Sequence, residues 1–333
     1  MRKKIMVFLL CLFCSGPLSI LAADDLILGG DSIGIEVTYD GVMVSGTYRF
    51  EVDGKSYDPS TQLKPHDIIV SINGTRIHSM DDLYAQLNKY QDGVNEIPIR
   101  IKRNQEEMDS VLISVFDKAS SSYKSGLYIK DKIAGVGTMT YYDPLSHTFG
   151  SLGHEIYDSD LKQIADVHSG TIYPAQVKSI QKAQDNVPGE KHAQIDYTQA
   201  LGDVLLNSEI GIYGTYDSLP TYAVALPWAK QDEIQVGPAK LYTVLDGERI
   251  DSYDINITKL NKQSQSSIKG IEFEVSDQRL LEATNGIIQG MSGSPIVQNG
   301  KIIGAVTHVV TSHPINGYGV YIEWMLDTSR SLK

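Results

Sequence analysis

Short runs in which apolar and polar residues alternate recur along most of this chain, and this two-residue period predicts strands. Residues 97–103 and 110–116 alternate in this way. The run 63–72 ends in the pair Asn73-Gly74, which is typical of a tight hairpin turn. The pattern therefore predicts a mainly β protein.

One helix interrupts the strands in the first third of the chain. Leu83, Leu87 and Tyr90 recur at helical spacing, and Ser79 can cap a helix over residues 80–90. Beyond it, glycine and proline turns separate short apolar runs, which favours a barrel or a sandwich. The 333 residues are enough for two hydrophobic cores. We expect a leader at 1–23, a small α+β domain at 24–117, a linker at 118–127 and a β domain at 128–333.

The N-terminus has the pattern of an export signal. Three basic residues at positions 2–4 precede an apolar stretch at 5–23. This stretch is also long enough for an uncleaved membrane anchor, and both alternatives stay open. Cys11 and Cys14 both lie within it. The predicted domains therefore contain no cysteine, which excludes disulfides and zinc thiolate sites from them.

The charge of the chain limits which classes of ligand are expected. The formal net charge is −12 at pH 7, and no basic stripe is present that could neutralise phosphates. Nucleic acid and anionic lipid headgroups are therefore not expected as ligands. Membrane contact is expected through the N-terminal segment only. The sequence indicates no metal site and no cofactor.

The strongest chemical signal is a serine between glycines in the segment 290–295, GMSGSP. A nucleophilic serine needs a tight turn whose backbone amides converge on the oxyanion. Ser292 is the predicted nucleophile, and the amides of Gly290 and Ser292 are the predicted oxyanion donors. His154, at a strand end followed by a turn, is the predicted general base. An ordinary glycine-rich turn with incidental serines is the alternative interpretation.

The segment 290–295 resembles the nucleophile region of chymotrypsin-like proteases, and the similarity continues into the strands that follow it. The resemblance implies a double β-barrel in the second domain. It also implies a strand that pairs with the substrate backbone, formed by Thr307, His308 and Val309. His308 is the one competitor of His154 for the role of base, because it lies on that strand.

The first domain resembles a PDZ domain, most clearly over residues 63–74. By that resemblance, the loop that binds a peptide carboxylate is formed by Ser32, Ile33, Gly34 and Ile35. Its amides would hold the peptide end while the peptide adds a strand to the sheet edge. A simple tight turn at Gly34 is the alternative.

The chain after the leader resembles the stage IV sporulation protein B (SpoIVB) peptidases, in which a PDZ domain precedes the protease. The resemblance rests on the segments 133–138, 150–154, 284–295, 304–309 and 317–326. It implies a catalytic triad of His154, Asp277 and Ser292. The spacing in chymotrypsin-like enzymes generally suits Asp203 better as the acid, so the choice between Asp277 and Asp203 stays open.

The resemblance implies an exported regulatory serine endopeptidase that cleaves itself and works between the forespore and mother-cell membranes. Its protein substrate would be a membrane-associated regulator of an intramembrane protease, and the cut would switch on late sporulation transcription. The alternative is an exported PDZ adaptor that binds peptides and carries an inactive barrel. The presence of both His154 and Ser292 favours the enzyme.

Overall fold

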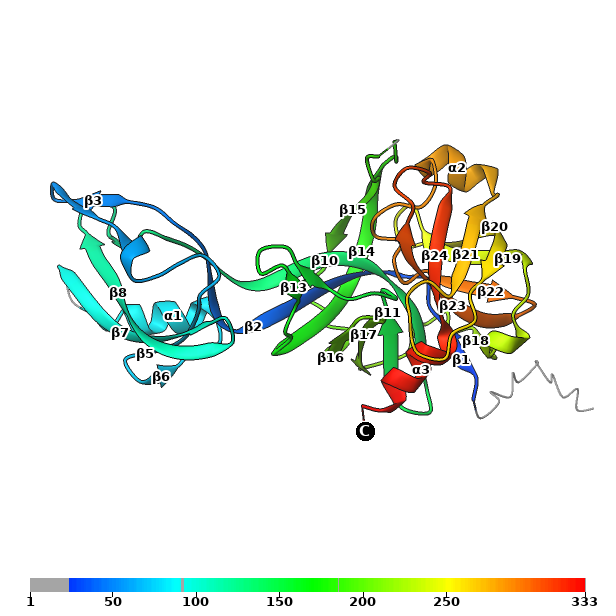
Figure 1. Ribbon diagram of the computed structural model, residues 1–333, viewed down its shortest axis with the longest axis horizontal. Helices are drawn as coiled ribbons and strands as arrows, with labels where there is room; N and C mark the ends of the chain where they lie inside the picture. The colour runs from blue at the N-terminus through cyan, green and yellow to red at the C-terminus, as the bar shows by residue number, and fades with distance from the viewer. Residues whose placement is uncertain (1–23, 91–92, 185, 333) are drawn as a thin grey trace, which may run out of the picture.

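A computed structural model of the chain describes residues 24–90, 93–184 and 186–332. The predicted export signal lies outside these residues. None of the described helices is long and apolar enough to cross a membrane. The described chain is mainly β, as its hydrophobic pattern predicted. Figure 1 shows a small domain joined by long strands to a larger body.

Six antiparallel strands close into a first barrel. In ring order they are β2 (Ser32–Thr47), β10 (Leu127–Asp143), β11 (Thr148–Ser151), β17 (Gly211–Tyr216), β16 (Gly202–Ser208) and β14 (Ser169–Gln181), which pairs back onto β2. Only the first part of β2 takes part, because residues 33–38 pair with β14 on one edge and with β10 on the other. Ile33, Phe149 and Ile172 are fully buried in its core.

A second six-stranded barrel follows the first. In ring order it contains β19 (Gly237–Val244), β20 (Ile250–Leu260), β21 (Ile271–Val275), β24 (Asn316–Tyr321), β23 (Lys301–Val309) and β22 (Pro295–Gln298). Two helices accompany it, α2 (Gln278–Thr284) after β21 and α3 (Ile322–Arg330) after β24. Leu241, Phe273 and Ile303 are buried in its core. The predicted double β-barrel is confirmed.

Shorter elements complete the larger body. They are β1 (Leu26–Leu28) and its partner β18 (Ala225–Leu226), the hairpin of β12 (Tyr157–Asp158) and β13 (Gln163–Ile164), β15 (Glu190–Ile195), and the 3-10 helix η2 (Gln231–Glu233). Strand β1 also pairs with β10, and β15 pairs with the far part of β14. These pairings extend the first barrel on both sides.

The small domain is built between the far halves of β2 and β10. The chain there forms β3 (Phe50–Val52), β4 (Lys55–Tyr57), the 3-10 helix η1 (Pro59–Thr61), β5 (Ile68–Ile72), β6 (Thr75–Arg76), α1 (Met80–Leu87), β7 (Val94–Arg103), β8 (Glu106–Asp117) and β9 (Ser122–Lys124). The predicted helix begins where expected, because the Ser79 side chain accepts a hydrogen bond from the Asp82 amide. Leu83 and Leu87 face the domain core.

The small domain is inserted into the first barrel, whereas the sequence predicted that it precedes the barrel. Strand β2 leaves the barrel and antiparallel β10 returns to it, with Ser32 opposite Thr138 at one end and Thr47 opposite Leu127 at the other. The predicted boundaries at 24–117 and 118–127 are therefore wrong, because the start of β2 belongs to the barrel. Both halves of β2 are rich in buried apolar residues, so the pattern does not show where one domain ends.

The predicted peptide-binding loop is also wrong. Ser32, Ile33, Gly34 and Ile35 lie in β2, where both strand edges are already paired. A peptide cannot add a strand to an edge that is occupied. A side chain at position 34 would meet Ile195, since an added Cβ would lie 2.4 Å from its Cγ2 atom. The glycine there serves close packing within the barrel.

We therefore expect the substitution Gly34→Asp to destabilise the barrel, because it forces a carboxylate into a buried position against Ile195. The midpoint of thermal unfolding, followed by circular dichroism, should fall clearly. Gly135→Asp is the matched control, because Gly135 lies on the paired strand β10 with open space around it. Equal midpoints for the two variants would contradict the pairing of β2 described here.

Candidate active site

A cleft of about 760 Å³ contains the predicted nucleophile, the predicted base and the predicted substrate strand. Both barrels contribute to its lining, which includes Ile35, Val136, His154, Gly290, Ser292, Thr307, His308 and Val309. The structure therefore brings together residues that lie far apart in the sequence. Asp277 and Asp203 are not part of this lining.

The loop that carries Ser292 is held by the first barrel. The Thr138 amide donates to the Ser292 carbonyl at 2.9 Å, and the Thr138 hydroxyl donates to the Gly290 carbonyl at 2.7 Å. Gly290 and Gly293 both have positive φ angles, of 88° and 91°. A Cβ at position 293 would lie only 2.0 Å from the Thr138 carbonyl oxygen. Glycine is therefore required where the two barrels meet.

The predicted oxyanion donors can donate hydrogen bonds to a ligand. In this loop the amides of Met291, Gly293 and Ser294 donate to backbone carbonyls. Within the part of the chain that the structure describes, the amides of Gly290 and Ser292 have no intramolecular acceptor. Two unengaged amides two residues apart, beside the predicted nucleophile, are suited to stabilise a developing oxyanion.

The Ser292 hydroxyl donates to the carbonyl of Thr307 at 3.1 Å. This contact holds the nucleophile against the predicted substrate strand, β23. The side chain has to leave this acceptor before it can donate to a base. Without bound substrate, the hydrogen bonds between catalytic residues are often long or poorly aligned, and the position of the Ser292 hydroxyl is of this kind.

His154 follows a tight turn after β11, in which Leu152 and Gly153 have positive φ angles. Its Nδ1 atom lies 2.7 Å from the carbonyl oxygen of Glu155. A hydrogen on Nδ1 donates to this oxygen, which leaves the lone pair on Nε2 available as a base. Burial lowers the pKa of His154, and the Glu155 carbonyl opposes the shift only in part. The ring is therefore neutral at pH 7, as a general base must be.

His308 lies beside His154, with the ring centroids 5.0 Å apart. Burial lowers the pKa of His308, and the charge that His154 can carry lowers it further. The two rings therefore disfavour each other's protonation. Both line the cleft, so His308 is a neighbour of the predicted base.

The structure does not bring Asp277 to His154. Its carboxylate caps helix α2, where it accepts hydrogen bonds from the Arg279 amide and guanidinium and from the Asp254 amide. The Arg279 side chain is the main cause of the shift that lowers the pKa of Asp277 to about 2. Asp203 is exposed on β16. A backbone carbonyl, that of Glu155, takes the place of a carboxylate at Nδ1 of His154.

Lys191 is a buried residue beneath the nucleophile loop that the sequence did not single out. Its Nζ atom donates to the Thr243 hydroxyl at 2.8 Å and lies 3.3 Å and 3.4 Å from the hydroxyls of Thr138 and Ser32. Its methylene groups pack beneath Gly290. Burial lowers its pKa to about 7. The sequence that ends at Lys191, Pro-Gly-Glu-Lys, is typical of a turn and did not indicate a buried amine.

Comparisons with known proteins place the chain in a family. A family model described as SpoIVB peptidase S55 matches residues 121–326. Among solved structures, the active form of the Rv3671c protease from M. tuberculosis is 14% identical, covers 60% of this chain and 74% of its own, and gives a TM-score of 0.35. An inactive form of the same protease is 14% identical, covers 58% and 84%, and gives a TM-score of 0.34. No curated protein matches the sequence.

The position of Asp277 leads to a prediction about Asp277→Asn. Asparagine can also cap a helix, so the variant keeps the cap and loses the ion pair between the buried Asp277 carboxylate and the exposed Arg279 guanidinium, at a cost of about 1.5–3 kcal/mol. We expect fluorophosphonate labelling of Ser292 to slow by less than about 10-fold. A loss of about 10⁴-fold with an unchanged unfolding midpoint would instead identify Asp277 as the catalytic acid.

The same pairing should depend on pH. The folded-state pKa of Asp277 is lowered to about 2, below the value of about 3.9 in unfolded chains. Its stabilisation is therefore present above pH 4 and lost as the pH falls from about 4 to 2. The difference in unfolding midpoint between the wild type and Asp277→Asn should shrink over this range.

Lys191 leads to the opposite pH dependence. Its pKa is lowered to about 7 in the folded protein and is about 10.4 when unfolded. Folding therefore carries a penalty that is full below pH 7 and disappears as the pH rises to about 10.4. Relative to the wild type, Lys191→Met should be more stable at pH 6 than at pH 10. A difference that does not change with pH would mean that the Lys191 amine is solvated.

Proposed function

The chain belongs to the SpoIVB peptidase S55 family, and from this premise we propose that it is an exported serine endopeptidase that processes itself and a membrane-associated protein. The serine peptidase class follows from the family. The substrate we propose is a regulator of an intramembrane protease, cut to start late sporulation signalling. The basic and apolar N-terminal segment supports export.

The observation that carries the proposal is that His154, Ser292 and the amide of Gly290 face one cleft between two barrels. In the proposed reaction, Nε2 of His154 takes the Ser292 proton while Oγ attacks the scissile carbonyl. The amides of Gly290 and Ser292 stabilise the resulting oxyanion. The protonated ring then passes its proton to the leaving amine, and water hydrolyses the acyl-enzyme.

The contact between Ser292 and Thr307 supports a role for the substrate in assembling this site. A substrate strand that pairs with β23 brings backbone N–H groups to the carbonyls of that strand. One of them competes with the Ser292 hydroxyl for the Thr307 carbonyl, which now accepts at 3.1 Å. The released hydroxyl can then turn to His154. Substrate binding and activation of Ser292 are thereby coupled, which limits the hydrolysis of peptides that do not pair with β23.

The lining of the cleft supports a preference for apolar side chains in the substrate. Most of its side chains near the nucleophile loop are aliphatic, and they include Ile133, Val136, Ile156, Ile287 and Ile288. Among the lining residues, Glu155 alone carries a carboxylate. Such a surface gains more from burying apolar groups than from pairing with a cation.

The proposal predicts that fluorophosphonate labelling and self-cleavage both disappear in Ser292→Ala. Labelling should fall by about 10³-fold or more in His154→Gln, because the base is lost. Ser294→Ala is the matched control, since Ser294 lies two residues away and its buried hydroxyl has no partner in the described structure. Ser294→Ala should label and process as the wild type does.

The natural substrate can be sought by comparing new protein N-termini in membrane fractions from cells that express the wild type or Ser292→Ala. A membrane-anchored protein cut only by the wild type would support the proposed role. A folded wild type that neither labels nor cleaves would favour the peptide-binding adaptor instead.

A further inference from the structure

The two domains meet at an irregularity in strand β2. On the barrel side Lys132 pairs with Thr38, and on the other side Lys130 pairs with Met43. Residues 39–42 of β2 therefore stand opposite a single residue of β10, Asp131. Such a bulge bends a strand and redirects its side chains. Here it directs Asp40 out of the sheet, between the barrel and the small domain.

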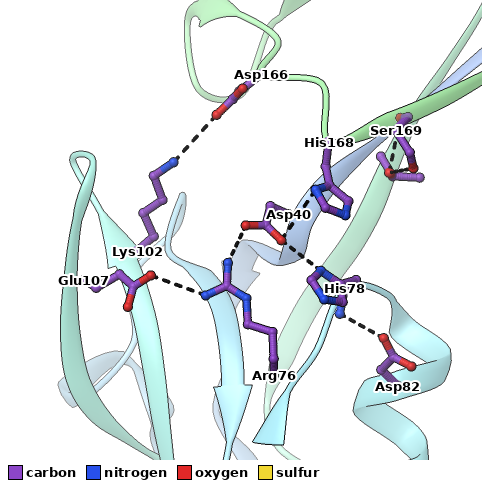
Figure 2. Close-up of polar contacts among 10 residues, drawn as sticks. Asp40, Arg76, His78, Asp82, Lys102, Glu107, Asp166, His168 and Ser169 are labelled. Carbon is purple, nitrogen blue, oxygen red and sulfur yellow. Dashed lines mark hydrogen bonds and ion pairs between the residues drawn. The ribbon is translucent and has the colours of Figure 1, made fainter. Parts of the chain in front are cut away.

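Two histidines converge on Asp40 from opposite sides of this joint, as Figure 2 shows. Nδ1 of His78, from the loop between β6 and α1 of the small domain, lies 2.8 Å from Oδ1 of Asp40. Nδ1 of His168, which directly precedes β14 of the barrel, lies 3.7 Å from the same oxygen. The three ligand atoms all lie within 4.8 Å of one another.

We propose that Asp40, His78 and His168 form a binding site for a divalent cation of the zinc type. Two imidazoles and one carboxylate are the ligands that Zn²⁺ and Co²⁺ favour. Tetrahedral coordination with bonds of about 2.0 Å places ligand atoms about 3.3 Å apart. The observed separations of 2.8 Å and 3.7 Å lie on either side of this value.

The two rings have to move before both can bind one ion. The imidazoles of His78 and His168 are stacked, with centroids 4.9 Å apart and planes 6° from parallel. Both present Nδ1 to one carboxylate oxygen, although a single hydrogen bond would use only one of them. Because a metal lies in the plane of each imidazole that binds it, coordination requires the rings to turn out of this stacked arrangement.

The surrounding contacts hold the ligands in place. Arg76 binds the second oxygen of Asp40 and is itself paired with Glu107 at 3.3 Å. The Asp40 carboxylate is therefore oriented to offer one oxygen to a metal, an arrangement typical of ligands with outer-shell partners.

A cation at this point would connect the two domains. His168 belongs to the barrel, His78 belongs to the small domain, and Asp40 lies on the strand they share. The ion pair of Lys102 with Asp166, at 3.6 Å, spans the same joint. The three ligands are separate from the cleft that contains Ser292. A bound cation would therefore fix the orientation of the small domain relative to the barrel. The fourth coordination position would be left for water or a further ligand.

The test is a titration of the full-length chain, without a histidine tag, with Co²⁺ and then with Zn²⁺. Cys11→Ser and Cys14→Ser are included in every sample, because these thiols could bind the metal themselves. We expect one Co²⁺ per chain with the intense visible bands of four-coordinate cobalt, displaced by Zn²⁺. His78→Gln, His168→Gln and Asp40→Asn should each weaken Co²⁺ binding by at least about 10-fold.

His192→Gln is the matched control, because His192 is an exposed histidine on β15, outside the proposed site. It should bind Co²⁺ as the wild type does. Zn²⁺ should raise the unfolding midpoint of the wild type and of His192→Gln, but not of the double variant His78→Gln/His168→Gln. Binding by the double variant as tight as that of the wild type, or the weak spectrum of six-coordinate cobalt, would overturn the proposal.

Discussion

The antiparallel pairing of β2 with β10 is the constraint on which both domains and the active site depend. Near one end of this pair, Ser32 lies opposite Thr138, and the first barrel closes through the other edge of β2. At the other end, both strands enter the small domain, where β2 pairs with β5 on one edge and with β10 on the other. The small domain therefore shares two strands with the barrel, whereas a domain on a flexible linker would share none.

Strand β10 positions both parts of the candidate site. Thr138 fixes the loop that carries Ser292 through its amide and its hydroxyl. The next residue, Met139, pairs with Ser151 at the end of β11, just before the turn that carries His154. The predicted base and the predicted nucleophile are thus both positioned by neighbouring residues of one strand. This matters because displacements of about 1 Å between reacting groups can cost about 10²-fold in rate.

A buried amine lies beneath the same contacts. Lys191 reaches Ser32 and Thr138, the paired residues of β2 and β10, and packs beneath Gly290. Its partners are hydroxyl groups, which satisfy an ammonium or a neutral amine without adding a second charge. An amine with a pKa of about 7 at this point gives the nucleophile loop a positive neighbour that depends on pH. The Thr138 hydroxyl that this amine contacts donates to the Gly290 carbonyl, so the amine is linked to the loop through one side chain.

The sequence predicted those parts of the site that depend on local conformation. Ser292 was predicted as the nucleophile from its glycine turn, and His154 as the base from its strand end, both together with the resemblance to chymotrypsin-like proteases; the structure places both at one cleft. The helix at α1 was found from its cap and its apolar spacing. The domain insertion was missed because alternation identifies a strand and not its partner. Asp277 was assigned as the acid from the family resemblance, whereas in the structure its carboxylate caps α2, a position that also favours aspartate.

The sequence likewise gave no sign of the polar cluster at the joint between the two domains. Asp40, His78 and His168 have no motif spacing, since the bulge in β2 and two separate loops bring them together. Binding at the small domain can influence the cleft only through differences in contact between two arrangements of the joint. The described connections are β2, β10, the polar contacts around Asp40 and the ion pair of Lys102 with Asp166. Strand β10 continues directly from the joint to Thr138, so the joint and the loop that carries Ser292 contact the same strand.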